Sequence, residues 1–306
     1  MTNIGLYPGG LTADATHEIK RTSSPFLDSI LGHSFPLLDH GFVRVIDYMG
    51  DDNAIVQMAR TSYGAGTTAI SDDRGLIRYL MRHAHTSPME GCEIKLHLKM
   101  PIFVARQWIR HRMASLNEIS GRYSVMKDEF YLPERDRLGR QSKTNKQGTA
   151  AEPYDDDKAH RILELLFEGA VDSFGAYDEF CREDTDLARE LARINLPLST
   201  YTEFYWKIDL HNLLHFLKLR CDSHAQYEIR VYADVIATLI SQWVPHAHEA
   251  WVDYKRDAVT FSRMEMAALR AILSAHSIML NGEDREWLAG EGLGKREITE
   301  FMAKVA

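Results

Sequence analysis

Apolar and polar positions along the chain alternate between a strand-like and a helix-like period. Residues 42–49 (FVRVIDYM) form an apolar, β-branched run, which predicts a strand. Residues 92–98 alternate between apolar and polar side chains, which predicts a strand with one buried face. A third strand is predicted at residues 202–210 (TEFYWKIDL). Strands mixed with amphipathic segments indicate an α/β or α+β fold.

Helices are predicted where apolar side chains recur every three or four residues. Asp51 is placed to cap one helix, and Asp72 or Asp73 to cap a second, which ends before Pro88. Pro101 suits the first turn of a helix over residues 102–112 (IFVARQWIRHR). Further helices are predicted near residues 158–182, 186–194, 211–222, 225–243 and 261–280, followed by a charged C-terminal helix.

Three segments lack a helical period. Residues 114–124 (ASLNEISGRYS) are too polar for a helix and alternate as an extended segment does. Residues 133–157 are expected to form a mobile polar excursion, and residues 1–38 an irregular N-terminal arm. With no internal repeat and no clear linker, we expect one decorated domain: a main body at 39–256 and a helical extension, 257–306, packed on it.

Composition narrows the possible partners. The chain has 306 residues, 45% of them hydrophobic and 26% charged, which is enough to fold around a sizeable core. Its net charge of −8 disfavours duplex nucleic acid and anionic membranes as partners. There is no run long enough for a membrane span and no secretory signal pattern, so a cytoplasmic location is expected. The three widely spaced cysteines predict neither a disulfide framework nor a paired metal motif.

Candidate chemistry concentrates between Arg106 and Arg122, which span four arginines but only one carboxylate, Glu118. On the predicted helix Gln107 and His111 are four residues apart and would share a face. In the extended segment Glu118, Ser120 and Arg122 are two apart and would also share a face. Arginine forks beside a serine hydroxyl suit a phosphate, although a solvated basic helix end would give the same pattern.

The string RHRMASLNEISGRYS, residues 110–124, resembles the signature of the flavin-dependent thymidylate synthases at every fixed position. Three other segments resemble that family in the same order: RHAHTSPME at 82–90, RELARINLP at 189–197 and LKLRCDSHAQYEIR at 217–230. The resemblance implies an α+β fold, a single domain with a central, mostly antiparallel, twisted sheet packed by helices.

The resemblance also assigns residues to ligands. It implies that deoxyuridine monophosphate (dUMP) is held by Gln107, Glu118, Ser120, Arg122, Arg193 and Arg220. It places Ser62, Ser87, Glu90, Arg110, His111, Arg112, Asp209, His215 and His224 at flavin adenine dinucleotide (FAD). The catalytic candidates are Arg220, which would stabilise charge on the uracil ring, His85 on the flavin and folate side, and Ser120, which we interpret as a binding hydroxyl.

The implied reaction is the reductive methylation of dUMP to dTMP. The carbon donor would be 5,10-methylenetetrahydrofolate and the electrons would come from NADPH through FAD, without a cysteine nucleophile. The resemblance further implies a homotetramer whose active sites are shared between subunits. Two alternatives remain: a non-catalytic flavin or nucleotide sensor, and a flavin- and folate-dependent enzyme that methylates nucleic acid, which the net charge disfavours.

The sequence departs from the family pattern near the third strand. Asp209, His211 and His215 stand where many relatives have Asn or Arg, which leaves their flavin contacts open. His211 and His215 have the spacing of a metal pair on a helix, but no third ligand accompanies them. No metal site is therefore predicted.

Overall fold

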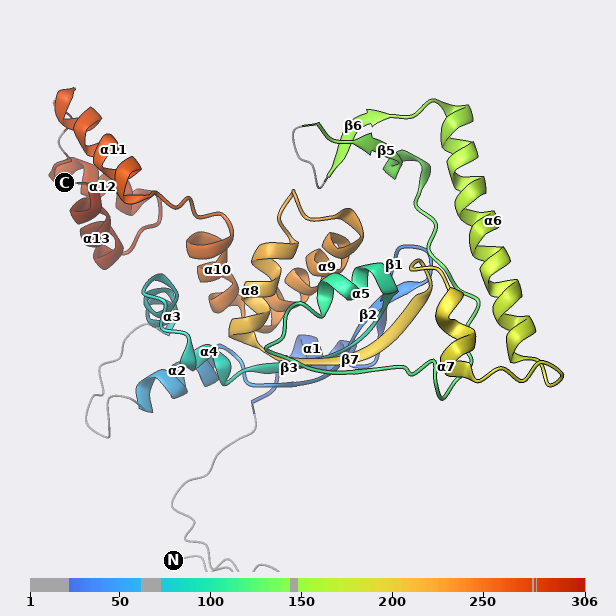
Figure 1. The fold of residues 1–306 in the computed structure, drawn as a ribbon. Helices are drawn as coiled ribbons and strands as arrows, with labels where there is room; N and C mark the ends of the chain where they lie inside the picture. Colours follow the sequence, from blue (N-terminus) through green and yellow to red (C-terminus); the bar gives the residue numbers. More distant parts are fainter. Residues whose placement is uncertain (1–21, 62–72, 144–147, 277, 279, 306) are drawn as a thin grey trace, which may run out of the picture. The chain divides into compact units, whose positions relative to one another are not determined.

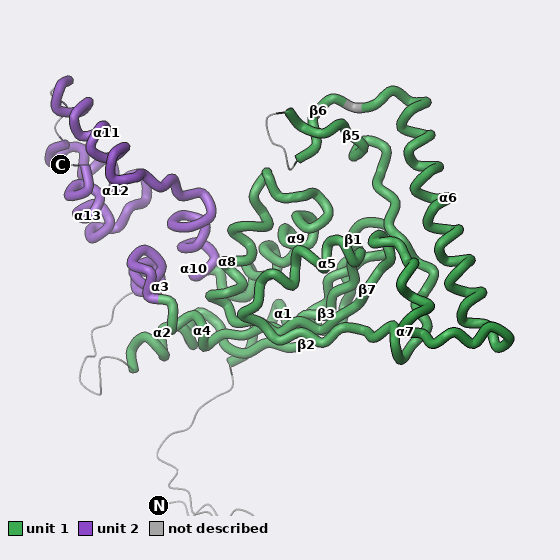
Figure 2. The backbone as a smooth tube through the Cα atoms, in the orientation of Figure 1, with its two compact units in different colours: residues 1–66, 86–245 green, residues 67–85, 246–306 purple. Residues whose placement is uncertain are grey.

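The computed structural model describes residues 22–61, 73–143, 148–276, 278 and 280–305. The chain divides into two compact units, shown in different colours in Figure 2. Unit 1 comprises residues 1–66 and 86–245, and unit 2 comprises residues 67–85 and 246–306. The C-terminal segment thus forms a unit with an internal segment, a division that the sequence pattern does not reveal.

Unit 1 is built around a five-stranded sheet whose neighbouring strands are all antiparallel (Figure 1). The strand order is β1-β2-β3-β7-β4. The strands are β1 (Ser34–Leu37), β2 (Gly41–Met49), β3 (Glu93–Pro101), β4 (Ser115–Glu118) and β7 (Tyr201–Asp209). The predicted α+β class with a mostly antiparallel sheet is confirmed, and all three predicted strands are present.

The alternation seen in the sequence of β3 becomes a buried face of the sheet. Ile94, Leu96 and Leu98 are at most 1% exposed, whereas the residues between them are partly exposed. Helices α5 (Ile102–Trp108), α8 (Leu210–Arg220) and α9 (Tyr227–Trp243) pack on the sheet. Burying these apolar side chains contributes roughly 1.5–3 kcal/mol for each large one.

Trp108, at the end of α5, lies at the centre of this packing. Its ring centroid is 4.4 Å from that of Phe216 on α8 and 5.1 Å from that of Trp206 on β7. Tyr232 on α9 contacts the same ring at 6.3 Å. The sheet and the three helices therefore share one aromatic core.

Among the other elements of unit 1, α1 and α4 contact the helices α9 and α8, whereas α7, η1 and η2 contact α6. Residues 25–37, expected to be irregular, instead form α1 and β1, and Ser24 caps α1 by accepting a hydrogen bond from the Leu27 N–H. The polar segment 133–157 contains an antiparallel β-hairpin rather than a plain excursion. These elements are α1 (Pro25–Ile30), α2 (Asp52–Thr61), α4 (Ser87–Glu90), η1 (Arg135–Arg137), β5 (Gly139–Gln141), β6 (Thr149–Pro153), α6 (Asp156–Cys181), α7 (Arg189–Ala192) and η2 (Arg193–Asn195).

Unit 2 is helical in its described parts. Its C-terminal region contains two helices, each with a capping box, where Ser262 and Asn281 bond the third residue of α11 and α12. The domain limits expected at residues 39, 256 and 257 stay a prediction. The elements of unit 2 are α3 (Asp73–Arg82), α10 (Pro245–Trp251, whose first residue belongs to unit 1), η3 (Val252–Arg256), α11 (Arg263–Ala275), α12 (Gly282–Gly290) and α13 (Lys295–Val305).

Two further properties concern only the described residues. None of their helices combines the length and apolar character that a membrane span needs. They also contain no group of three or more His, Cys, Asp or Glu side chains that could hold a metal ion.

The first residue of β2, Gly41, provides a test of the packing. A Cβ at Gly41 would lie 1.9 Å from the Tyr232 hydroxyl oxygen and 2.8 Å from the Leu37 carbonyl oxygen. Tyr232 is fully buried and donates a 2.7 Å hydrogen bond to the Lys99 carbonyl, so it has little room to move. We expect Gly41→Ala to destabilise the protein by about 1–3 kcal/mol.

Gly175→Ala is the matched control, since no atom lies within 4 Å of a Cβ at that position in α6. It should stabilise the protein by about 0.5–1 kcal/mol, because alanine has the higher helix propensity. Thermal and urea unfolding of both variants measure the effects. Equal midpoints for Gly41→Ala and the unmodified chain would contradict the described packing.

Candidate functional site

The signature segment begins at the end of α5, which is shorter than predicted. The helix ends at Trp108, and the His111 N–H bonds to the Trp108 carbonyl in a turn. The expectation that Gln107 and His111 share a helix face is therefore wrong. Both nevertheless meet one side chain, Arg220, at the last turn of α8.

Arg220 joins the signature segment to α8 through two hydrogen bonds. Its Nε donates to His111 Nε2 over 3.1 Å, and its Nη2 donates to the Gln107 carbonyl over 3.3 Å. His215, five residues earlier on α8, has its ring centroid 6.3 Å from that of His111. Residues 109 positions apart in the sequence thus form one polar cluster.

The electrostatics of this cluster keep His111 neutral. Burial is the main factor that lowers the pKa of His111, and the positive charge of Arg220 and the neighbouring His215 lower it further, to about 4. A neutral imidazole with an unprotonated Nε2 is the form that can accept the hydrogen bond from Arg220. The geometry and the pKa therefore agree.

The second half of the signature forms a turn, not the extended segment that was expected. Strand β4 ends at Glu118, whose carboxylate accepts a 2.6 Å hydrogen bond from Thr202 on β7. From there the Ser120 hydroxyl accepts a hydrogen bond from the Arg122 N–H, and the Ser124 N–H bonds to the Ser120 carbonyl. Glu118, Ser120 and Arg122 therefore do not share the face of one strand.

This turn lies against the segment that contains α7 and η2. Arg122 forms a 3.0 Å ion pair with Glu190, and Arg189 donates a hydrogen bond to the Tyr123 carbonyl. Gly121 is buried, and a Cβ there would lie 3.1 Å from Cδ of Arg193. The structure therefore brings Ser120, Arg122 and Arg193 into one region, and their assignment to a nucleotide stays a prediction.

Helix α6 packs against this region. Phe174 and Tyr177 of α6 form a buried cluster with Ala192 of α7, and Met126 packs against it. The Tyr177 hydroxyl also accepts a hydrogen bond from the Met126 N–H. The turn that follows the signature and the segment of Arg193 are thus held on the same helix.

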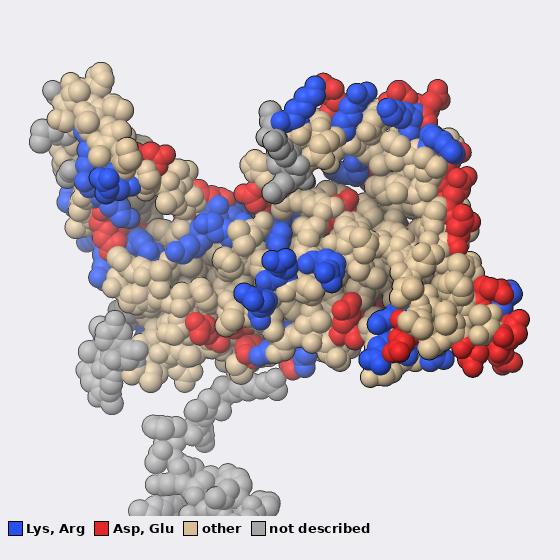
Figure 3. All heavy atoms as spheres, in the orientation of Figure 1, with Lys and Arg blue, Asp and Glu red and all other residues tan. Residues whose placement is uncertain are grey.

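Two arginines of the signature, and Arg106 just before it, are available to an anion. Arg106, Arg110 and Arg112 are exposed, and no ion pair joins them to a carboxylate in the described part of the chain. Basic side chains gather on the face of unit 1 in Figure 3, over α5 and the loop that follows it. Guanidinium groups without a carboxylate partner favour phosphate binding.

Several residues expected at the flavin have other contacts in this structure. The Asp209 carboxylate caps α8 by accepting hydrogen bonds from the N–H and the side-chain amide of Asn212. His224 lies in the loop after α8, with Nδ1 2.9 Å from a carboxylate oxygen of Asp222. Ser62 lies outside the described residues. The flavin assignment of all three stays a prediction.

The His-rich segment 82–90 crosses from unit 2 into unit 1. His85 is the last residue of the internal segment of unit 2, and its ring lies 5.6 Å from that of Tyr79. Ser87 and Glu90 begin and end α4 in unit 1, and neither is buried. The Thr86 hydroxyl donates a 3.4 Å hydrogen bond to the Glu90 carboxylate.

Neither Cys92 nor Ser120 has the surroundings of a nucleophile. Cys92 is fully buried, and burial together with the neighbouring carboxylates raises the pKa of its thiol to about 12, so it carries no thiolate at neutral pH. The Ser120 hydroxyl bonds to a backbone N–H, which cannot act as the base that a nucleophilic serine needs. Ser120 is therefore suited to bind rather than to attack.

Sequence reasoning missed two partners of the site. Glu190 pairs with Arg122, and Gln226 accepts a 2.6 Å hydrogen bond from the side-chain amide of Gln107. Glu190 and Gln226 both lie inside segments that resemble the family, yet no spacing rule connects positions so far apart in the chain. Only the fold reveals these contacts.

The chain is similar to known proteins over most of its length. Residues 44–246 match the model of the family described as "Thymidylate synthase complementing protein". The flavin-dependent thymidylate synthase of Wolbachia pipientis wMel is 50% identical over 284 residues, which cover 93% of this chain and 96% of that protein. The protein of the same name from Gluconobacter oxydans (strain 621H) is 51% identical over 278 residues, which cover 90% of this chain and 89% of that protein.

A solved structure agrees with these relatives. The crystal structure of the UMP/dUMP methylase PolB from Streptomyces cacaoi, bound with 5-Br UMP, matches with a TM-score of 0.65 and 33% sequence identity. The match covers 72% of this chain and 97% of that chain. Because the family model matches residues 44–246 and these relatives are about 50% identical over most of the chain, the chain belongs to the flavin-dependent thymidylate synthase family.

Proposed function

We propose that this chain converts dUMP to dTMP by reductive methylation, with 5,10-methylenetetrahydrofolate as the carbon donor, NADPH as the source of electrons and FAD as the redox cofactor. Curated relatives about 50% identical to this chain are named flavin-dependent thymidylate synthases, and a structural neighbour is named a UMP/dUMP methylase. The observation that carries the proposal is the contact of Arg220 with His111. It joins the signature string to the later arginine segment in one polar cluster.

The nucleotide fits the region around Ser120, Arg122 and Arg193. A monophosphate needs charged forks and neutral donors, and this region supplies guanidinium groups beside a hydroxyl. The Arg122 side chain is 57% exposed and its partner Glu190 is 53% exposed, so their ion pair is weak and can be exchanged for a phosphate. We assign Gln107, Glu118 and Arg220 to the uracil side of the same ligand.

The described residues also fit a dinucleotide flavin. Arg110 and Arg112 are exposed and form no ion pair with a carboxylate in the described part of the chain, which matches the charge of a pyrophosphate. His111, His215, His224, Asp209, Ser87 and Glu90 supply further donors and acceptors, and Ser62 is assigned to the flavin by resemblance alone. When bound, FAD supplies the electron-transfer chemistry that side chains lack.

Arg220 is the candidate for stabilising negative charge on the uracil ring. Its bonds to His111 and to the Gln107 carbonyl fix the guanidinium plane before any ligand binds, and such preorganisation is a main source of catalytic stabilisation. Because His111 is neutral, it orients Arg220 without adding a positive charge. We assign His85 to the flavin and folate side and Ser120 to nucleotide binding.

We further propose a homotetramer whose active sites are shared between subunits. One site must surround a nucleotide, a dinucleotide and a folate, while the candidate residues lie in short, largely exposed segments. Symmetric assembly creates clefts between copies without additional chain length.

The function is tested by tritium release from the 5-position of the uracil ring. Flavin-loaded protein given folate donor and NADPH should release tritium from labelled dUMP, and dTMP should appear in equal amount. Labelled UMP is run in parallel, because PolB is named a methylase of both nucleotides. No release above a control without enzyme would contradict the proposal and would favour a non-catalytic sensor.

Arg122→Ala should weaken dUMP binding by about 10- to 150-fold, because a charged hydrogen bond to a phosphate contributes roughly 1.5–3 kcal/mol. The control is Arg161→Ala, which removes another exposed arginine paired with a glutamate, on α6. Calorimetric titration measures both affinities, and flavin content should stay constant. An unchanged dUMP affinity in Arg122→Ala would remove Arg122 from the nucleotide site.

The ring of His111 should stay neutral in the ligand-free protein down to about pH 4. An unfolded histidine titrates near 6.5, so between these values the unfolded state binds more protons and stability falls as the pH is lowered. His111→Gln keeps a hydrogen-bond acceptor but does not titrate, so it should lose less stability than the unmodified chain over this range.

NMR titration of the ring and unfolding midpoints between pH 4 and 7 check this prediction. Arg220→Gln should raise the pKa of His111, since one of the charges that lower it is gone. His160→Gln, at an exposed position of α6, is the control for replacing a histidine. A His111 ring that titrates at the ordinary histidine value would show that the bond to Arg220 does not form in solution.

A further inference from the structure

The segment that carries His85 ends α3 in a conformation that alanine rarely adopts. Ala84 has φ +56°, in the left-handed region, where a non-glycine residue is strained. The Ala84 N–H bonds to the Met81 carbonyl, and the His85 N–H bonds to the Leu80 carbonyl over 2.9 Å. These are the two bonds of a Schellman motif, which usually has glycine in place of Ala84. Strain of this kind persists only where the surroundings hold the backbone in place.

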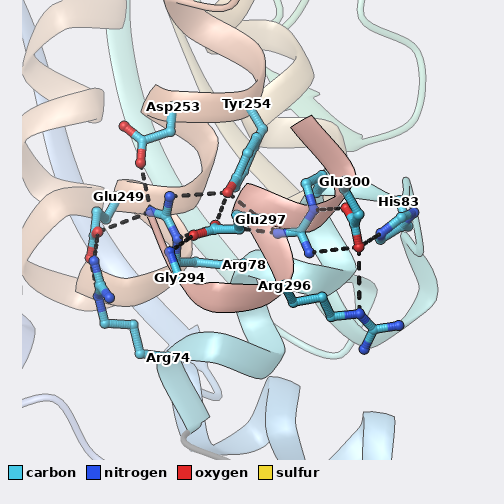
Figure 4. A network of polar contacts seen from close by, with 11 residues as sticks. Arg74, Arg78, His83, Glu249, Asp253, Tyr254, Gly294, Arg296, Glu297 and Glu300 are labelled. Atoms are coloured by element: carbon cyan, nitrogen blue, oxygen red, sulfur yellow. Dashed lines mark hydrogen bonds and ion pairs between the residues drawn. The ribbon is translucent and has the colours of Figure 1, made fainter. Parts of the chain in front are cut away.

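Two arginines of α3 form several ion pairs with carboxylates from other helices of unit 2. Arg78 and Arg82 lie one turn apart, and their side chains are only 10% and 9% exposed. Figure 4 shows the network in which they lie, with carboxylates contributed by α10, η3 and α13. Arg78 bonds Asp253 over 2.6 Å, and both arginines bond Glu297 of α13.

Glu300 of α13 contacts the residues at the end of α3. Its carboxylate accepts a 2.5 Å hydrogen bond from Nε of Arg82, the last residue of α3, and lies 3.2 Å from Nε2 of His83. The hydrogen bond from Arg82 is the main factor that lowers the pKa of Glu300, to about 2. Glu300 is therefore ionised at any working pH.

A second contact from α13 reaches the same segment through Tyr79. The guanidinium of Arg296 lies over the Tyr79 ring, 4.2 Å from its centroid. That ring in turn contacts the rings of His83 at 4.5 Å and His85 at 5.6 Å. Arg296 also lies 3.4 Å from Glu300, so the two contacts belong to one network.

We propose that Glu300 and Arg296 of α13 are positioning residues for His85. Glu300 fixes the end of α3 by bonding Arg82 and His83, and Arg296 fixes the ring of Tyr79 against which His85 lies. The C-terminal helix thereby holds the strained turn in the conformation that presents His85. The inference rests on the proposed function, which gives His85 its place beside the flavin and folate.

A double-mutant cycle between Glu300 and His85 tests this role. In the flavin-loaded full chain, Glu300→Gln should lower kcat by about 10- to 100-fold, the size of effect expected from a small misplacement of a reacting group. The KM for dUMP should change little. In a His85→Ala background the same substitution should change kcat by no more than about 2-fold, because coupled residues are not additive.

Glu286→Gln is the matched control. It removes the same charge from an exposed position of α12, so kcat should not change. Arg296→Gln provides a second positioning variant in case Glu300→Gln does not fold. Its effect on kcat should likewise disappear in the His85→Ala background. If either variant lowers kcat equally with and without His85, the proposal is wrong and the network is only structural.

Hydrogen–deuterium exchange gives a readout that does not depend on activity. Glu300→Gln should speed exchange at residues 83–85, where the His85 N–H closes the turn, and leave β3 unchanged. If the unmodified chain makes dTMP but Glu300→Gln leaves exchange at residues 83–85 unchanged, only the positioning role is overturned. If the unmodified chain makes no dTMP, the proposed function is refuted whatever the exchange shows, and with it the role of His85.

Discussion

The antiparallel register between β3 and β7 determines where the groups of the candidate site meet. Pro101, the last residue of β3, lies opposite Tyr201, and Asp209, the last residue of β7, lies opposite Glu93. Helices α5 and α8 follow these two ends directly, so they start at opposite ends of one strand pair. Both pack back onto the strands, which brings their C-terminal ends together and places Arg220 beside His111.

Aromatic packing, rather than charge, sets the distance between the C-terminal ends of α5 and α8. The Trp108 side chain of α5 packs between this helix and the elements β7 and α8, with Trp206 and Phe216 as its nearest rings. Its indole N–H is buried and has no hydrogen-bond partner in the described part of the molecule, a cost that the surrounding contacts must offset. Because close-packed interiors resist small displacements, this core keeps the polar cluster rigid without a ligand.

The sequence was sufficient for the main strands and long helices but not for the local path of the signature. Periodicity located β3 and β7, since each has a clearly buried face, and the resemblance supplied the antiparallel sheet. Periodicity gave the wrong path after Trp108 and after Glu118. The chain turns there because side chains and backbone bond locally, as Ser120 does with the Arg122 N–H. Local hydrogen bonds of this kind compete with regular structure and leave no period in the sequence.

Contacts between distant segments were equally beyond what the sequence pattern predicts. No spacing rule connects Arg220 with His111, or Arg82 with Glu300, because the sheet register and the helix packing create both pairs. The early helix α1 was missed for a simpler reason. It is only six residues long, too short for a helical period to be recognised, although its Ser24 cap and Pro25 are the usual signals of a helix start.

Two pairs of arginines in this acidic chain differ in their burial and in their partners. In unit 2, Arg78 and Arg82 are nearly buried and bonded to carboxylates on more than one side, so an incoming anion would first have to displace those carboxylates. In unit 1, Arg110 and Arg112 are exposed and have no such partner among the described residues, so they can be neutralised by a ligand. For these four arginines, burial and pairing distinguish side chains that hold the fold from side chains that are free to bind a phosphate.

The C-terminal part of the network lies beyond the end of the family model, past which the matches to relatives extend. The family model ends at residue 246, yet the match to the Wolbachia relative covers 93% of the chain and must extend well beyond that residue. The match to PolB covers 72% of this chain while taking in 97% of the other. Helix α13 therefore lies outside the part of the chain that the family model matches, although relatives of similar length extend beyond that part.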